Sequence, residues 1–254
     1  MLWYKAWLET RWRFLIGLAL LVIMAVGTVF DYLAVQKLMP LAGLVDYSGE
    51  LGRRLKEAVD LERTYRGFVW LQWFRQNLSQ AGTLLAVILG SGSALSSTAG
   101  GVLFTLSMPA SRREVLRVRS MLGLAEWGAL AFVPSLVIPL FSPAVGQSYS
   151  VVDALVHGLC VFVAGAVCFS LASWLSTLFA DLWRPVLLAC GIVIVLGIAE
   201  TAAGDAGRLG LFHVMSGDSY FRTGQLPWVG LVVSVAASAA LLMGAARNLD
   251  SREY

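Results

Sequence analysis

Long apolar stretches without charged residues recur along this chain, and shorter segments that carry the charges separate them. The apolar stretches lie near residues 14–33, 78–101, 121–141, 153–179, 185–203 and 226–246. A helix needs about 20 apolar residues to cross the hydrocarbon core of a bilayer. The pattern therefore predicts an all-α integral membrane protein with six transmembrane helices, in which residues 1–254 form a single domain.

The composition agrees with this pattern and excludes one class of partner. Hydrophobic residues make up 58% of the chain and charged residues 14%, whereas about a quarter of the residues in a soluble domain are charged. The net charge is only +3, and the basic residues are dispersed along the chain. A nucleic-acid-binding protein instead gathers such residues on one face, so we expect the lipid bilayer as a partner and no nucleic acid.

The positions of lysine and arginine predict the orientation, because short loops on the cytoplasmic side of a membrane carry an excess of these residues. With the N-terminus inside, the inner segments contain Lys5, Arg11, Arg13, Arg112, Arg113, Arg117, Arg119, Arg184, Arg247 and Arg252. The two short outer segments, near residues 142–152 and 204–225, contain only Arg208 and Arg222. The remaining outer segment, 34–77, is too long to carry much weight in this rule. We therefore expect a multi-pass protein of the cell (inner) membrane with both termini in the cytoplasm.

The densest group of positive charges lies between the second and third predicted spans, in the stretch TLSMPASRREVLRVRS at residues 105–120. Ser111 and Glu114 have the spacing of a capping box, which satisfies free amides at a helix start. Pro109 disfavours helical geometry at the residue before it. The pattern predicts a helix that begins at Ser111 and continues into the third span. Charge alone also fits a simpler interpretation, in which the arginines anchor the topology and contact anionic headgroups.

This segment resembles the loop between the second and third spans in the membrane subunits of type-2 ATP-binding-cassette (ABC) exporters. The matching positions are Gly100, Leu106, Ser107, Pro109, Ser111, Arg112, Arg113 and Glu114. That family also has six spans, cytoplasmic termini and an amphipathic N-terminal helix, so the resemblance covers essentially the whole chain. Two positions depart from the family pattern: residues 96–98 read SST where an acidic residue is usual, and Gly101 replaces a threonine.

The resemblance implies a permease subunit that moves a substrate, outward in this family, with a separate ABC ATPase and a second permease copy or paralogue as partners. The chain has no GxxxxGK[ST] motif to bind phosphates. We therefore expect no enzymatic activity and no cofactor on this chain, with ATP and Mg on the ATPase. Residues 103–119 are expected to form the cytoplasmic coupling helix that docks on the ATPase. Its contact residues would be Leu106, Ser107, Pro109, Ser111, Arg112, Arg113, Glu114 and Arg117.

Three other stretches each allow more than one interpretation. Residues 1–13 place tryptophans four apart among basic residues, which favours a helix in the membrane interface; the alternative is an extension of the first span. In the second span, small residues recur at four-residue spacing, and Gly90, Ala94, Ser97 and Gly101 are candidates for close helix packing. They would contact a second copy or the export path, or pack within the chain. The segment 34–77 would cap the outer mouth, bind a partner or lie on the membrane.

Two other functional classes have less support in the sequence. A membrane-embedded enzyme needs clustered catalytic or metal-binding groups, and neither HExxH nor GxSxG occurs. An ion-coupled carrier or a channel, acting without an ATPase, remains the alternative, although charges near the middle of the spans are scarce. The ionisable residues Glu126, Asp153 and Glu200 all lie near predicted span ends. His157 follows Asp153 by one turn and either pairs with it or is a packed histidine.

Overall fold

The computed structural model describes residues 2–42, 49–91, 112–179, 181, 183–203 and 210–250, and within these ranges every regular element is a helix. The elements are α1 (Leu2–Ala42), α2 (Gly49–Glu62), α3 (Tyr65–Val69), the π-helix η1 (Trp70–Leu78), α4 (Ser79–Ser91), α6 (Arg112–Phe141), the 3-10 helix η2 (Ser142–Val145), α7 (Val151–Ser176), α8 (Trp183–Ala202), α9 (Leu211–Ser216), α10 (Asp218–Thr223) and α11 (Trp228–Asp250). This confirms the all-α prediction for the described residues.

Five of the described helices are long and apolar enough to cross a membrane, namely α1, α6, α7, α8 and α11. They lie where the first, third, fourth, fifth and sixth apolar stretches predict them. The structure is therefore that of a multi-pass membrane protein. The second predicted span, 78–101, differs: the helix in this region begins at Tyr65 and continues unbroken through η1 and α4 to Ser91.

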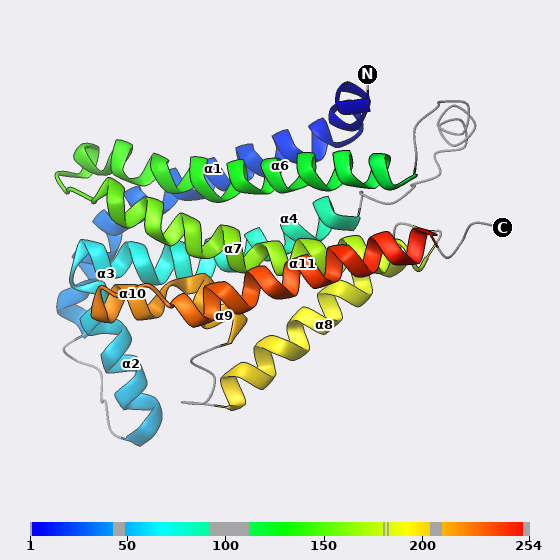
Figure 1. The fold of residues 1–254 in the computed structure, drawn as a ribbon. Coiled ribbons are helices and arrows are strands. Elements are labelled where there is room, and N and C mark those ends of the chain that lie inside the picture. Colours follow the sequence, from blue (N-terminus) through cyan, green and yellow to red (C-terminus); the bar gives the residue numbers. More distant parts are fainter. Residues whose placement is uncertain are drawn as a thin grey trace.

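Helix α7 is the centre of the bundle (Figure 1). Helices α4, α6 and α11 pack along it, and α1 packs along α6. Of the five long helices, α7 is also the most buried. Helix α8 crosses the bundle at a steep angle, so its C-terminal end stands away from α4 and α7.

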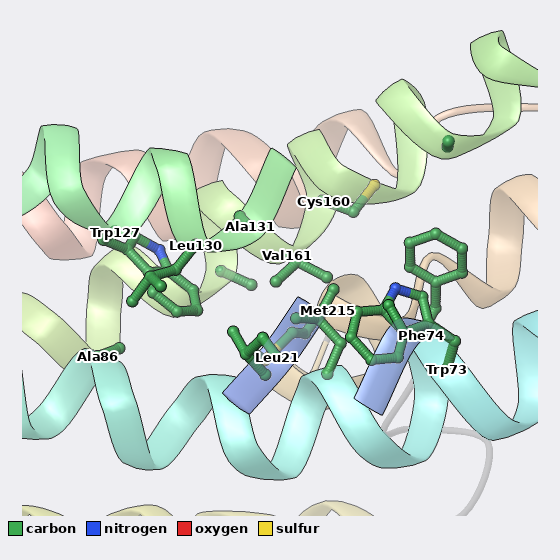
Figure 2. Close-up of a cluster of buried hydrophobic side chains, with 14 of the residues drawn as sticks. Leu21, Trp73, Phe74, Ala86, Trp127, Leu130, Ala131, Cys160, Val161 and Met215 are labelled. Atoms are coloured by element: carbon green, nitrogen blue, oxygen red, sulfur yellow. The ribbon is translucent and has the colours of Figure 1, made fainter. Parts of the chain in front are cut away.

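Aromatic side chains and small residues together fill the core (Figure 2). Trp127 of α6 and Trp73 and Phe74 of η1 are fully buried. The Trp127 indole Nε1 donates a hydrogen bond to the Phe162 carbonyl oxygen at 2.9 Å. The ring lies directly on Gly165 of α7, because a Cβ added there would come within 2.1 Å of Trp127 Cζ2. The glycine thus leaves the space that allows α6 and α7 to approach closely.

The bundle has two distinct ends. The start of α1, the end of α4, the start of α6 and the end of α11 lie together, on the right of Figure 1, and we call this the terminal end. The opposite end carries α2, α3, η2 and α10. The first described turn of α1 and the last described turn of α11 therefore lie at the same end, which agrees with the prediction that both termini lie on one side. Which side of a membrane this end faces stays a prediction.

The structure divides the predicted external segment 34–77 into three parts. Residues 34–42 continue α1, and α2 extends away from the bundle. Residues 65–77 instead pack inside the bundle, with Trp70, Trp73 and Phe74 fully buried. At the N-terminus, α1 has no break after residue 13, as expected if the first turns extend the first span. The interface location of residues 1–13 stays a prediction.

Candidate functional site

The predicted coupling segment is described only from Arg112 onward. Helix α6 runs from Arg112 to Phe141, which agrees with the helix predicted to begin at Ser111 and continue into the third span. Glu114 and Arg117 have exposed side chains in its first turns. Arg112 and Arg113 occupy the first two positions of α6. The other predicted residues lie outside the described part: Leu106, Ser107, Pro109 and Ser111 of the coupling segment, and Ala94, Ser97 and Gly101 of the small-residue candidates.

Two polar contacts join the first turns of α1 to the first turns of α6. Arg119 donates from Nη2 to Glu9 Oε2, and the Arg119 side chain is only 12% exposed. Thr10 donates from its hydroxyl to Glu126 Oε1. Arg119 thus faces α1, whereas Arg117 on the same helix is exposed. These two contacts form what we call the α1–α6 clasp, which the sequence does not predict because it depends on packing between distant segments.

The α1–α6 clasp also contains buried polar atoms that the described residues leave without a hydrogen-bond partner. They are Arg119 Nη1, Ser120 Oγ and Glu126 Oε2. Arg119 also lines a cavity of about 10 Å³, together with residues that include Thr10, Leu89 and Gly123. This volume is about that needed for one water molecule. A bound water at this point would satisfy part of the clasp and link α1, α4 and α6.

Gly90, one of the predicted packing residues, lies at the contact between α4 and α7. It is buried, and a Cβ added there would come within 2.2 Å of the Phe169 carbonyl oxygen and 3.1 Å of the Ala172 Cβ. Close approach of this kind is the function of small residues between membrane helices. Gly90 thus packs within the chain, which is one of the two interpretations that its spacing allows.

At the opposite end, Asp153 joins three elements. Its Oδ2 accepts a hydrogen bond from Arg66 Nε of α3 at 2.8 Å, and its Oδ1 accepts one from the Tyr220 hydroxyl of α10 at 3.0 Å. His157 Nδ1 contacts the backbone oxygen of Asp153 at 2.8 Å, and its ring stacks on Phe74. His157 therefore makes no ion pair with the Asp153 carboxylate and is a packed histidine, as one of the two interpretations of the sequence has it.

Tyr149 lies next to this network, between η2 and α7. Its hydroxyl group makes the stability of the protein depend on pH in the alkaline range. Burial, and then the charge of Asp153, raise the pKa of Tyr149 above its ordinary value near 10. The stability that comes from keeping this hydroxyl protonated is complete below about pH 10, and it is lost as the pH rises from there toward the folded-state pKa. Its hydroxyl has no hydrogen-bond partner among the described residues.

We therefore expect Tyr149→Phe to leave stability at pH 8 unchanged or higher by up to about 1 kcal/mol, since it removes a buried unsatisfied group. It should also lose less stability than the wild type between pH 9.5 and 11. Thermal unfolding midpoints of the detergent-solubilised protein measure both effects. Tyr4→Phe, at an exposed position, is the matched control. Identical alkaline profiles for wild type and Tyr149→Phe would contradict the prediction.

A larger cavity, of about 340 Å³, lies between the helix formed by η1 and α4 and the helices α8, α9 and α10. Its charged and polar lining includes Arg75, Ser79, Glu200, His213 and Asp218. The sequence indicates no site here, because the lining residues come from three separate stretches, 75–79, 197–201 and 212–218. The described residues contain no cluster of His, Cys, Asp and Glu that could hold a metal ion.

Comparisons of this chain with models of protein families, with curated proteins and with solved structures find no match. The function is therefore inferred from the geometry and chemistry of its own residues.

Proposed function

We propose that this chain is the membrane subunit of an ATP-driven transporter of the type-2 ABC exporter kind. A separate ATPase subunit binds ATP and Mg, and its hydrolysis cycle moves a substrate outward through the membrane helices. The observation that carries this proposal is the cationic start of α6, which is continuous with a membrane-crossing helix and clasped to α1. An exposed start and an apolar continuation are what a coupling helix requires.

Helix α6 is long enough to carry a movement from its first turn into the membrane-crossing part. Its 30 residues extend about 45 Å at 1.5 Å per residue, and Pro134 and Pro139 lie inside its last third. Proline removes a backbone hydrogen bond and kinks a helix, so a partner that moves the first turn displaces the part of α6 before Pro134 as one unit. Arg112, Arg113 and Arg117 supply guanidinium groups, which bind carboxylates through paired hydrogen bonds. Arg119 is committed to Glu9, so the same movement is passed to α1.

The positions of the two termini support six crossings. Chain termini at the same end of a bundle require an even number of crossings, and both termini lie at the terminal end. Five described helices qualify as spans by length and composition. We assign the sixth crossing to the unbroken helix from Tyr65 to Ser91, which extends roughly 40 Å.

A second permease copy or paralogue fits the exposed apolar surface. Large apolar side chains on α8 and α11 are more than half exposed, among them Trp183, Leu187, Val229 and Val232. Lipid and a partner subunit both cover such surfaces in a membrane. A transporter of this kind needs two membrane subunits to enclose a path, so part of this surface is assigned to the subunit contact.

The proposal is tested by reversing the charge of the coupling helix. The double variant Arg112→Glu/Arg113→Glu should bind an ABC ATPase encoded by a neighbouring gene about ten-fold more weakly than the wild type, because desolvated interfacial charge pairs strongly affect dissociation. Co-purification and stimulation of ATP hydrolysis in proteoliposomes measure the effect. Arg184→Glu is the matched control, because Arg184 is an exposed arginine that pairs with Asp181 at the start of α8.

Equal binding and stimulation by the wild type and the double variant would remove the coupling role of α6. If the wild-type chain binds no ATPase and transports a substrate alone, the proposed function is wrong.

A further inference from the structure

The 340 Å³ cavity joins a polar interior to an apolar outer surface. Its size is within the range of small-molecule sites, about 300–1,000 Å³. Gly197, Glu200 and Thr201 of α8 form one wall, at the end of α8 that stands away from the bundle in Figure 1. On the adjoining surface of the same helix, Ile194 and Ile198 are 61% and 64% exposed. An apolar track thus leads along α8 to the rim of a polar cavity.

Arg75 lines this cavity and supplies a guanidinium group to it. It is an exposed residue of η1, with its guanidinium carbon 5.5 Å from the centroid of the Trp70 ring. It makes no ion pair within the described part of the chain. Arginine at a membrane interface binds phosphate readily, because its planar donors match two phosphate oxygens.

Two carboxylates line the same cavity, and both are held in place by other groups. Glu200 accepts hydrogen bonds from the backbone amides of Phe212 and His213, at 3.0 and 2.6 Å. Asp218 accepts from Arg222 Nε at 3.0 Å and lies 3.6 Å from His213 Nε2. Each carboxylate has about four lone-pair sites, so both retain acceptor capacity. Among the described residues, the lining thus offers the Arg75 guanidinium, which makes no ion pair, and two fixed carboxylates.

We propose that this cavity binds the headgroup of a zwitterionic phospholipid of the phosphatidylethanolamine type. The phosphate binds Arg75, the ammonium group faces Glu200 and Asp218, and the acyl chains lie along the apolar track on α8. A purely anionic headgroup would be repelled by the two carboxylates of the site, because its net charge is negative. A free zwitterion shares the headgroup chemistry but makes no use of Ile194 and Ile198. The inference does not depend on the proposed transport function.

Native mass spectrometry of the purified chain in detergent tests this proposal by lipid titration. We expect one phosphatidylethanolamine to bind at least ten-fold more tightly than its N-acetyl derivative, which keeps the phosphate and lacks the ammonium charge. Arg75→Gln should weaken phosphatidylethanolamine binding about ten-fold or more, since it removes a charge-assisted hydrogen bond, while Arg75→Lys should retain part of the affinity. Arg63→Gln, which alters an exposed pair with Asp60, should bind like the wild type.

A second variant separates loss of binding from misfolding. Thr201→Trp fills the exposed rim without removing a cavity charge, and it should also reduce lipid binding while the elution profile in size-exclusion chromatography stays that of the wild type. Equal binding by the wild type and Arg75→Gln would overturn the site. Equal affinity for the N-acetyl lipid would overturn the recognition of the ammonium group. If soluble phosphoethanolamine binds as tightly as the lipid, the acyl chains do not contribute, and the assignment of the headgroup to a lipid is overturned.

Discussion

Replacement of Arg119 by glutamate is expected to detach the first turns of α1 from α6 and to lower the free energy of unfolding by roughly 2–3 kcal/mol. Loss of one partner from a fully buried ion pair costs about 3–5 kcal/mol. The loss expected here lies at or below the lower limit of that range, because the Glu9 side chain is 38% exposed, although that of Arg119 is only 12% exposed. Thermal unfolding in detergent measures the loss, and limited proteolysis near the N-terminus reports the detachment.

The charge swap Glu9→Arg/Arg119→Glu should recover at least half of the lost stability, because it restores an ion pair with reversed polarity. Arg117→Glu is the control on the same helix, since the Arg117 side chain is exposed, and it should change stability by less than about 0.5 kcal/mol. If Arg117→Glu and Arg119→Glu destabilise equally, the α1–α6 clasp does not hold the two helices together.

Substitution of valine for Gly90 is expected to separate α4 from α7 and to lower the free energy of unfolding by about 3 kcal/mol or to prevent folding. The added Cβ would lie 2.2 Å from the Phe169 carbonyl oxygen, a backbone atom that cannot rotate away. Overpacked sites cost about 1–3 kcal/mol where side chains can adjust, so a backbone clash should reach or exceed the upper value. Thermal unfolding and the yield of monodisperse protein in detergent measure the effect.

Gly191→Val in α8 is the matched control, because a Cβ added at Gly191 has no atom within 4 Å. This variant should fold like the wild type. If the Gly90→Val protein is as stable as Gly191→Val, α4 and α7 do not approach closely at Gly90. Gly90 would then again be a candidate for contact with a second copy.

Hydropathy alone locates the five described helices that are long and apolar enough to cross a membrane, because each is a continuous run of apolar residues that needs no distant partner. It misplaces the start of the helix at Tyr65, since polar residues interrupt its first half. The structure pairs several of them with distant groups: Arg66 with Asp153 at 2.8 Å, and Asn77 with Thr28 at 3.3 Å. A local pattern cannot reveal such partners, so this part of the sequence looks like an exterior loop.

The two candidate sites differ in the same way, since one depends on local sequence signals and the other on contacts between distant residues. The start of α6 is predictable because capping and proline signals act within a few residues. The large cavity is not predictable in this way, because Arg75, Glu200 and Asp218 come together only after α8 has packed on α4 and α9, and after Phe221 of α10 has stacked on Trp70 of η1. The sequence does indicate that Glu200 lies near a span end. It contains no local signal that Arg75 would be placed near this carboxylate.

The unbroken length of α1 has a mechanical consequence. Its 41 residues extend about 60 Å, roughly twice the thickness of the hydrocarbon core. One end is held by Glu9 and Thr10, and near the other Tyr32 packs against Tyr65 and Phe68. A continuous helix resists bending, so α1 forms a stiff connection between the terminal end of the bundle and the opposite end. A displacement of its first turns would therefore reach the aromatic residues near the opposite end without passing through a loop.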